Sequence, residues 1–379
     1  MQAHEDDMVA LLKKLVEINS YSHNKAGSNA VADVIQEECE ALGLHTRRDV
    51  HELVGDTLIV ETTAHRNGQK GILLCGHMDT VFVPDSGFTA FRRDAGKFYG
   101  PGVADMKCGL VEGVFLFKAL RHLNLLDTMS IVLVCNADEE IGSPYSTDRI
   151  IAEAKKSCVA FVLESAKESG ELVVGRKGRM TFELEVCGQA GHAATAPKNK
   201  PSAILELACQ IQAYEALNAP EEGTSVNVGV IEGGTGVNTV AERARAVVEC
   251  RYTNKECGEK VYKTIQKLVA SPQTEGTTCT VNIIGARPSM TTSDAILGLF
   301  DLVQEAGKEL GLSLTCVQCG GGSDANTISQ LGIPVIDGVG PIGGNLHSEQ
   351  EYLLAETFVE RAALTTVVVA RAWDRYCQQ

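Results

Sequence analysis

Histidine and carboxylate side chains recur along this chain where apolar segments end. Two histidines, one aspartate and two glutamates are enough to hold two zinc ions, because Zn²⁺ binds imidazole and carboxylate groups. Two such ions can share one carboxylate while they promote a hydrolytic displacement. Two further acidic side chains would then remain for hydrogen-bond support and proton transfer. The seven residues are His77, Asp79, Asp105, Glu139, Glu140, Glu164 and His347.

The spacing within the motifs predicts how some of these residues act. In GHMDTV, His77 ends an apolar run and Asp79 points to the same side of an extended chain. We therefore expect the Asp79 carboxylate to accept a hydrogen bond from the ring of His77 and to fix its tautomer. In YGPGVAD, Asp105 precedes a predicted helix whose N-terminus favours an anion. In NADEEIG, neighbouring glutamates point apart, so Glu140 can bind metal while Glu139 acts as general base.

Each motif taken alone also has an ordinary structural explanation. A histidine at a strand end is commonly part of a turn, and an aspartate before a helix is commonly an N-cap. Adjacent glutamates commonly form a solvated loop, and Glu164 and His347 would be solvated by default. The occurrence of all seven residues in this order favours the metal site. Six other histidines are assigned to the solvated class: His4, His23, His45, His51, His65 and His122.

The segments between the motifs predict two domains, as a length of 379 residues also suggests. The runs DTLIVETT, GILLCGH, MSIVLVCNA and CVAFVLES alternate with helical periods, which indicates an α/β fold with a mostly parallel sheet flanked by helices. From Gly178 the pattern changes to the order β-α-β-β-α-β, a ferredoxin-like α+β arrangement. The α/β pattern returns near Pro288. We expect a discontinuous catalytic domain, 1–177 and 289–379, interrupted by an inserted domain, 178–288.

Composition limits the partners and the compartment. A net charge of −15 argues against nucleic acid, and no apolar run approaches the ~20 residues of a membrane span. The thirteen cysteines are scattered and are expected to be reduced, as in a cytoplasmic protein. Cys316 and Cys319 have CxxC spacing, which could bind zinc or act in redox chemistry, but no second such motif accompanies them.

The ordered motifs resemble those of a family of co-catalytic zinc metallopeptidases. This family contains glutamate carboxypeptidase (carboxypeptidase G), acetylornithine deacetylase, succinyl-diaminopimelate desuccinylase and peptidase T. The segments GGTGVNTVAERA, VVECRYTNKE, GARPSM and GGGSDANTIS are most similar to the glutamate carboxypeptidase branch. Cys250 departs from the pattern, since an acidic residue or valine is usual there. The resemblance covers nearly the whole chain and implies a catalytic domain interrupted by a dimerisation domain.

The resemblance also implies which residues bind the two zinc ions. His77 and Glu164 would hold one ion, Glu140 and His347 the other, and Asp105 would bridge them. Cobalt or manganese are possible substitutes for zinc. A non-proline cis peptide bond is expected between Asp105 and the methionine that follows it.

Further roles follow from the same resemblance. Asp79 would support His77, Glu139 would be the general base, and His192 in GQAGHAATAP would stabilise the oxyanion across a homodimer. A turn histidine and solvated arginines are the ordinary alternatives. Arginine can grip a carboxylate with two hydrogen bonds, and backbone N–H groups can also bind an anion. The candidates for the substrate carboxylate are Asn238, Arg251, Arg287, Gly320, Gly321 and Gly322.

These observations predict a cytoplasmic, homodimeric di-zinc hydrolase that cleaves an amide bond next to a free carboxylate. A glutamate carboxypeptidase-like enzyme that releases a C-terminal glutamate-like residue is the leading hypothesis. An N-acyl-amino-acid deacylase of the acetylornithine deacetylase or succinyl-diaminopimelate desuccinylase type is the alternative. A metal-binding protein without activity is a third hypothesis, against which the retained Glu139 weighs. The expected partner is a small peptide or N-acyl amino acid, with neither nucleic acid nor membrane.

Overall fold

The computed structural model describes residues 1–378, which divide into two compact units. The large unit comprises Met1–Gly175, Thr292–Gln318 and the described residues from Ser323 onward. The small unit comprises Arg176–Thr291 together with the short segment Cys319–Gly322. The large unit is therefore interrupted twice in the sequence, by one long segment and one short segment that belong to the small unit.

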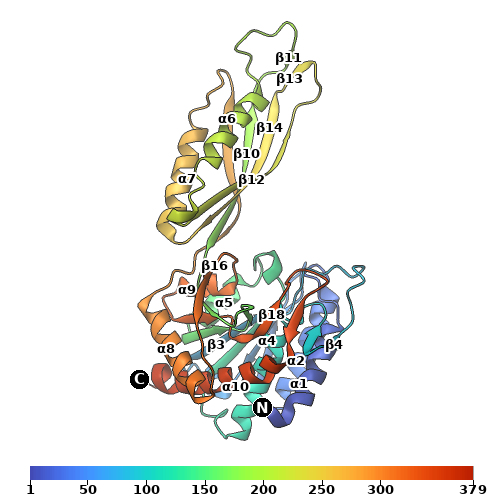
Figure 1. Cartoon of the computed structure of the whole chain (residues 1–379), viewed down its shortest axis with the longest axis vertical. Helices are drawn as coiled ribbons and strands as arrows, with labels where there is room; N and C mark the ends of the chain where they lie inside the picture. The colour runs from blue at the N-terminus through green and yellow to red at the C-terminus, as the bar shows by residue number, and fades with distance from the viewer. Residues whose placement is uncertain (379) are drawn as a thin grey trace. The chain divides into compact units, whose positions relative to one another are not determined.

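An eight-stranded sheet forms the centre of the large unit, in the order β1-β2-β6-β3-β7-β17-β9-β16. Strands β3 and β16 of this sheet are labelled in Figure 1. The central strands β6, β3, β7 and β17 are parallel, whereas β2 and β9 run antiparallel to their neighbours in this group. The expected mostly parallel sheet flanked by helices is thus confirmed for its centre, with antiparallel flanks. The strands are β1 (His45–Asp49), β2 (Thr57–Glu61), β3 (Gly71–His77), β6 (Ile131–Asn136), β7 (Ser157–Val162), β9 (Leu172–Arg176), β16 (Cys316–Cys319) and β17 (Val335–Asp337).

One of the most apolar segments of the sequence forms helix α4 (Lys107–His122). It is buried along most of its length and packs against α1, α2 and α10. Because α4 begins two residues after Asp105, its packing restrains that carboxylate. The other helices of the large unit are α1 (Glu5–Val16), α2 (Lys25–Glu40), α3 (Thr63–Arg66), α5 (Thr147–Ala154), α8 (Asp294–Glu309), α9 (Asp324–Ser329) and α10 (Ala355–Ala372), with short turns η1 (Gln2–His4), η2 (Glu139–Ile141) and η4 (Trp373–Cys377). Among the described residues, no helix has the length and apolar character needed to cross a membrane.

A second, smaller sheet of the large unit joins segments that are far apart in the sequence. Its order is β4-β5-β19-β18-β8. Ser165 of β8 pairs with Gly340 of β18, so the residue after Glu164 lies beside the strand that leads to the His347 loop. The strands are β4 (Arg92–Asp94), β5 (Lys97–Tyr99), β8 (Ser165–Ala166), β18 (Gly340–Gly344) and β19 (Tyr352–Leu354).

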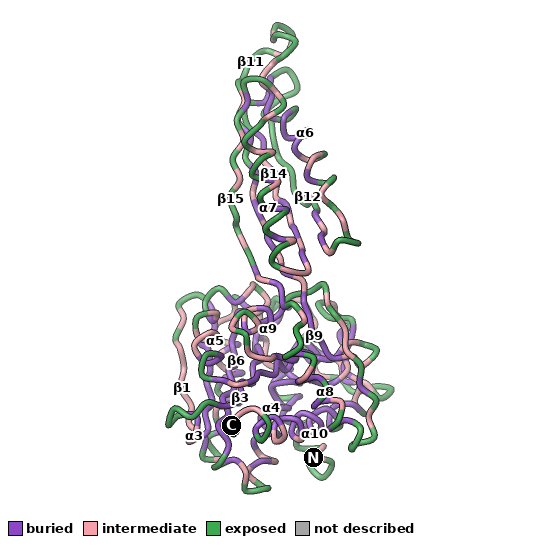
Figure 2. Tube along the Cα trace, turned by 90° about the vertical axis from the view of Figure 1, so that its left-hand side faces the viewer, coloured by how far each residue is buried: buried purple, intermediate pink, exposed green. Residues whose placement is uncertain are grey.

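The small unit has one four-stranded antiparallel sheet, in the order β12-β14-β10-β15, with two helices. One face of this sheet, with Phe182 and Val248, packs in a core with the helices, and the opposite face is charged. Strand β15 lies at one edge and is largely exposed (Figure 2). The elements are β10 (Gly178–Cys187), α6 (Ala203–Glu215), η3 (Pro220–Glu222), β12 (Thr224–Gly233), β14 (Arg243–Tyr252), α7 (Lys255–Val269) and β15 (Thr278–Arg287), plus the pair β11 (Gly191–His192) and β13 (Thr239–Val240).

Candidate metal centre

Strand order brings the expected metal ligands together in the large unit. The parallel neighbours β6, β3 and β7 end at the same edge of the sheet, where α/β proteins commonly bind ligands. His77 ends β3, Glu140 lies in the turn η2 just after β6, and Glu164 follows β7. Asp105 precedes α4, and His347 lies in the loop between β18 and β19.

The Asp105 carboxylate lies between two groups of candidate ligands. Its Oδ1 is 3.1 Å from Nε2 of His77, and its Oδ2 is 3.2 Å from Nε2 of His347. Nε2 of His77 is also 3.5 Å from Oε1 of Glu164. Nε2 of His347 is 3.2 Å from Oε2 of Glu140. Each carboxylate oxygen of Asp105 thus faces a different histidine and glutamate pair, the arrangement required of a shared ligand.

The protonation chemistry of the cluster fits divalent cations. Burial raises the pKa of Glu140 to about 7 and that of Glu164 to about 8, so both side chains hold protons readily in the metal-free chain. Metal binding releases such protons, because a cation needs the deprotonated ligand. The candidate ligand atoms of His77, Asp105 and Glu140 all lie within 4.8 Å of one another, and so do those of His77, Glu139 and Glu164. These donors fit two hard or borderline metal ions.

The two histidines carry protons where the cations would bind. Burial opposes charge on His77, but Glu164, Asp105 and Asp79 raise its pKa well above the usual value. Hydrogen bonds to Asp105 and Glu140 likewise raise the pKa of His347 to about 10. Burial would raise the pKa of Asp105, yet the two histidines hold it well below its usual range. The carboxylates of this cluster are therefore stabilised by positive charge, which bound metal ions would supply in place of the protons.

Asp79 supports the cluster in a way that differs from the expectation. Nδ1 of His77 donates to the main-chain oxygen of Asp79 at 2.9 Å, while the nearer carboxylate oxygen is 3.4 Å away. The carboxylate instead accepts hydrogen bonds from the backbone N–H groups of Glu139 (3.1 Å) and Glu140 (3.2 Å) and from Oγ of Ser22 (2.7 Å). The backbone thus orients His77, and the Asp79 side chain positions the turn that carries both glutamates. The short hydrogen bond of His77 thus goes to the main-chain oxygen of Asp79, and the expected carboxylate partner lies at ion-pair distance, 3.4 Å.

Glu351 is a further residue of the centre that the sequence motifs did not reveal. It is fully buried. Its carboxylate accepts hydrogen bonds from the backbone N–H groups of Ala104 (2.8 Å), Asp105 (3.0 Å) and Gly102 (3.3 Å). Since Glu351 lies four residues after His347, it ties the Asp105 loop to the His347 loop. An acidic residue at the start of the apolar segment EYLL was the available signal.

Backbone conformation also distinguishes these loops. The peptide bond between Asp105 and Met106 is cis, which confirms the expectation drawn from the resemblance. His347 has a φ of 61°, in the left-handed region that few residues other than glycine adopt. Its side chain is 55% exposed, in contrast to the buried His77. The centre therefore combines one rigid, buried ligand with one on an accessible loop.

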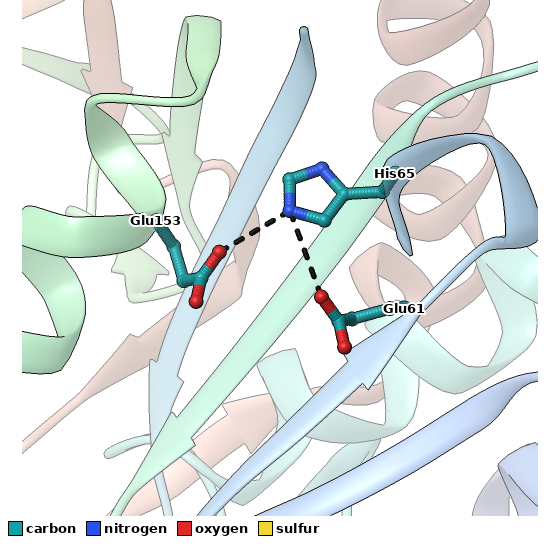
Figure 3. Close-up of side chains that lie close together, drawn as sticks. All are labelled: Glu61, His65 and Glu153. Carbon is teal, nitrogen blue, oxygen red and sulfur yellow. Dashed lines mark hydrogen bonds and ion pairs between the residues drawn. The ribbon is translucent and has the colours of Figure 1, made fainter. Parts of the chain in front are cut away.

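A second group of possible ligands lies elsewhere in the large unit, at His65, Glu61 and Glu153 (Figure 3). His65 was expected to be solvated, but it is buried, with Nε2 3.2 Å from Glu153 and 3.8 Å from Glu61. The positive charge that a metal would supply is already present here, so the group forms an ion-pair network. Three cations pair with Glu153: Arg47 at 2.6 Å, Arg149 at 3.0 Å and Lys156 at 3.0 Å.

The small unit separates the remaining candidates into two groups. His192 of β11 pairs with Thr239 of β13, and the N–H of Ala193 donates to the oxygen of Asn238 at 2.9 Å. His192 and Asn238 therefore lie together near the start of β14. Arg251 lies eight residues further along β14 than Arg243, about 26 Å at 3.3 Å per residue.

The second group collects around the segment Gly320–Gly322. Nη1 of Arg251 donates to the oxygen of Gly320 at 2.7 Å, and Nη1 of Arg176 donates to the oxygen of Gly321 at 3.1 Å. The carbonyl groups of this segment thus face arginines. Arg287 is buried and lies two strands from Arg251 in the same sheet.

This fold, with histidines and carboxylates gathered at the carboxyl ends of parallel strands, defines a class of metal-binding hydrolases. The chain belongs to peptidase family M20/M25/M40, whose model matches residues 73–371. The resemblance inferred from the motifs is thereby confirmed, and the chain is a hydrolytic enzyme.

Individual relatives span nearly the whole chain. Carboxypeptidase G2 of Pseudomonas sp. (strain RS-16) is 28% identical over 366 residues, covering 93% of this chain and 86% of the relative. A succinyl-diaminopimelate desuccinylase of Caulobacter sp. (strain K31) is 26% identical over 388 residues, with 96% of each chain covered. The crystal structure of a tripeptidase from Staphylococcus aureus is similar with a TM-score of 0.79 and 25% identity, covering 97% of this chain and 99% of that one.

Proposed function

We propose that this enzyme binds two zinc ions per chain and hydrolyses an amide bond next to a free carboxylate. The observation that carries this proposal is the position of Asp105, whose two oxygens face separate histidine and glutamate pairs. We further propose that the released group is a C-terminal glutamate-like residue, as similarity to carboxypeptidase G2 suggests.

The structure supports a definite division of the ligands. His77 and Glu164 would hold one ion, Glu140 and His347 the other, with Asp105 shared, and cobalt or manganese could replace zinc. When bound, the ions would polarise the amide carbonyl and lower the pKa of water.

Glu139 would take the proton from the attacking water and return it to the leaving amine. The Asp79 carboxylate would hold the backbone of Glu139 in place for this transfer. Accepting and returning the proton require no large movement of the turn η2, because its N–H groups at Glu139 and Glu140 donate hydrogen bonds to Asp79. The resulting arrangement is that of a positioned general base beside a metal centre.

The small unit would bind and polarise the substrate. His192 would stabilise the oxyanion, and Asn238, which lies beside it, would contact the substrate from the same chain as His192. Arg251 and Arg287 with the segment Gly320–Gly322 would hold the carboxylate from the other chain. Arg243, at the end of β14 near His192, lies about 26 Å along the strand from Arg251, at eight residues of 3.3 Å each. This distance exceeds the size of a small substrate. His192 and Arg251 of one chain therefore cannot both contact one such molecule, which supports a homodimer that shares its sites.

An exposed apolar edge supports the homodimer independently. Val230 and Ile231 of the edge strand β12 are 48% and 62% exposed. Edge strands with apolar side chains are templates for pairing with another chain. The free thiol state of all thirteen cysteines supports a cytoplasmic location.

The alternative is an N-acyl-amino-acid deacylase of the acetylornithine deacetylase or succinyl-diaminopimelate desuccinylase type. The similarity to a desuccinylase over 96% of both chains favours it. Both reactions cleave an amide formed by an amino acid, so the same catalytic residues serve either. The two functions differ in which side of the amide is recognised.

A substrate panel would decide between these functions. Zinc-loaded protein would be tested with dipeptides ending in glutamate, aspartate or leucine, and with N-acetyl and N-succinyl amino acids. We expect hydrolysis that a chelator abolishes and zinc restores, with preference for C-terminal glutamate. Preference for the N-acyl substrates would establish the deacylase instead. Absence of turnover on every substrate, with zinc bound, would contradict both.

A further inference from the structure

Three arginines lie in register across adjacent strands of the small sheet. Arg179 of β10 is directly opposite Arg251 of β14 on one side and Arg287 of β15 on the other. Directly opposite residues of antiparallel strands point to the same face, with Cβ atoms about 4.5–5.5 Å apart. Because the neighbouring Met180 packs in the core, the three arginines project from the face opposite the helices.

The contacts of this arginine row leave Arg179 without an anion. Arg251 is paired with Glu249, Nε to Oε1 at 2.7 Å. Glu249 is opposite Thr181 in the ladder, and its carboxylate pairs with Arg251. Within the described chain the side chain of Arg179 makes neither a hydrogen bond nor an ion pair, and its Nε is buried. Arg287 is itself buried beside it.

A bound anion would stabilise Arg179, whose buried Nε has no partner and which lies between two other arginines. Like charges directly opposite in a sheet repel, and a buried donor without a partner costs stability. The row is also a concentration of positive charge in a chain with a net charge of −15. Guanidinium groups bind carboxylate and phosphate oxygens with paired hydrogen bonds, so an anion between the arginines would relieve both costs.

We propose that Arg179, Arg251 and Arg287 form a site for a group with two negative charges, and that Arg179 selects for the second charge. The two carboxylates of a short dicarboxylate and a phosphate monoester share this chemistry. As part of catalysis the proposal rests on the proposed function, where it defines the substrate class as amides that carry such a dianionic group. Arg179 then determines specificity and takes no part in bond cleavage.

The test measures anion binding without turnover. The full-length chain, stripped of metal so that anions cannot bind there, is titrated calorimetrically with glutarate, inorganic phosphate and acetate. We expect at least one dianion to bind at least tenfold more tightly than acetate, and Arg179→Ala to remove this preference. Tighter glutarate binding identifies a dicarboxylate, and tighter phosphate binding identifies a phosphoryl group. Failure of both dianions to bind, or unchanged binding in Arg179→Ala, overturns the proposal.

A matched control and a stability measurement exclude a structural role. Arg243 lies on the same face of β14 at its other end and is exposed, so Arg243→Ala should bind anions like the wild type. Because Arg179 faces like charges, Arg179→Gln should melt at the same or a higher temperature than the wild type without anions. A lower melting temperature would mean that Arg179 serves packing. Because binding is measured apart from hydrolysis, an inactive protein that binds dianions would contradict only the proposed function.

Discussion

At the scale of single residues, burial and charge decide what the metal centre can do. Asp105 is a buried carboxylate held between two histidines whose pKa values are raised, and Glu140 and Glu164 are largely buried carboxyl groups whose pKa values are also raised. The pKa shifts of Asp105 and the two glutamates are opposite because Asp105 contacts two histidines, whereas burial dominates at each glutamate, which contacts one histidine and lies near the negative charge of Asp105. Cations that replace the protons would leave all three carboxylates ionised and both histidines neutral.

Replacing Glu139 by glutamine should separate catalysis from metal binding. Glutamine keeps the shape of the side chain but cannot accept a proton, so kcat should fall about 10²–10⁴-fold. Elemental analysis should still find two metal ions per chain. The neighbouring variant Glu140→Gln is the matched control and should lose metal. Turnover close to the wild type in Glu139→Gln would remove that residue from the role of general base.

Zinc should bind more tightly as the pH rises. In the metal-free chain burial raises the pKa of Glu140 to about 7 and that of Glu164 to about 8, and hydrogen bonds to Asp105 and Glu140 raise the pKa of His347 to about 10. At about pH 6 these groups hold protons that zinc must displace, and at about pH 8 fewer remain. We expect roughly a tenfold gain in affinity per pH unit for each proton displaced.

Competition titrations with a chromophoric chelator across this pH range would measure the gain. Calorimetry in two buffers with different ionisation enthalpies would count the protons released. An affinity that does not change with pH, without proton release, would show that the ligands are already deprotonated in the metal-free chain.

At the scale of elements, the metal centre depends on loops anchored to one another. Asp105 and His347 come from segments far apart in the sequence, and neither loop has a regular hydrogen-bonded element around its ligand. Glu351 connects them, because it follows His347 in the chain and binds three N–H groups of the Asp105 loop. Groups that orient a ligand in this way commonly affect metal affinity.

The Glu351→Gln variant should therefore weaken zinc binding about 10–100-fold, because an amide cannot accept from three N–H groups as a carboxylate does. Zinc titration checks this value, and kcat at saturating zinc should change less than the affinity. Glu349→Gln is the control, since Glu349 lies in the same loop and is exposed. Equal zinc affinities for the Glu351→Gln variant and the wild type would show that the loop is held by other contacts.

At the scale of the whole molecule, the two groups of small-unit residues support the proposal that two chains share each active site. His192 lies near one end of the small sheet and Arg251 near the other, so a single chain cannot present both to one small substrate. The inserted order β-α-β-β-α-β leaves the edge strands β12 and β15 free. A homodimer formed through an edge would supply His192 from a second chain.

Mixing inactive variants would test this sharing. Excess Glu139→Gln chains combined with His192→Ala chains should regain activity, since one site of a mixed dimer has an intact base and an intact His192. Subunit exchange would be followed by labelling the two variants with different fluorophores. If exchange occurs and activity does not return, His192 acts within its own chain or has no catalytic role.

The candidate metal ligands could be predicted from the sequence because most of their signals are local. His77, Glu140 and Glu164 lie at or just after the ends of apolar runs, and residues at the ends of neighbouring parallel strands must meet at one edge of the sheet. Asp105 and His347 lie in glycine-containing loops and were recognised by their motifs. The period-two segments and helical periods of the inserted region similarly indicate its order of elements. Local pattern thus determined the class of site and the α/β layering, including the fully buried strands β3 and β6.

Tertiary structure alone decided which distant groups meet. The burial of His65 depends on Glu153, 88 residues away, and the role of Glu351 depends on a loop 246 residues earlier. The row of Arg179, Arg251 and Arg287 depends on strand order and register, which no local period specifies. The local sequence pattern indicates which face of a strand is buried. Which charged side chains lie next to one another is decided only by the pairing and register of the strands.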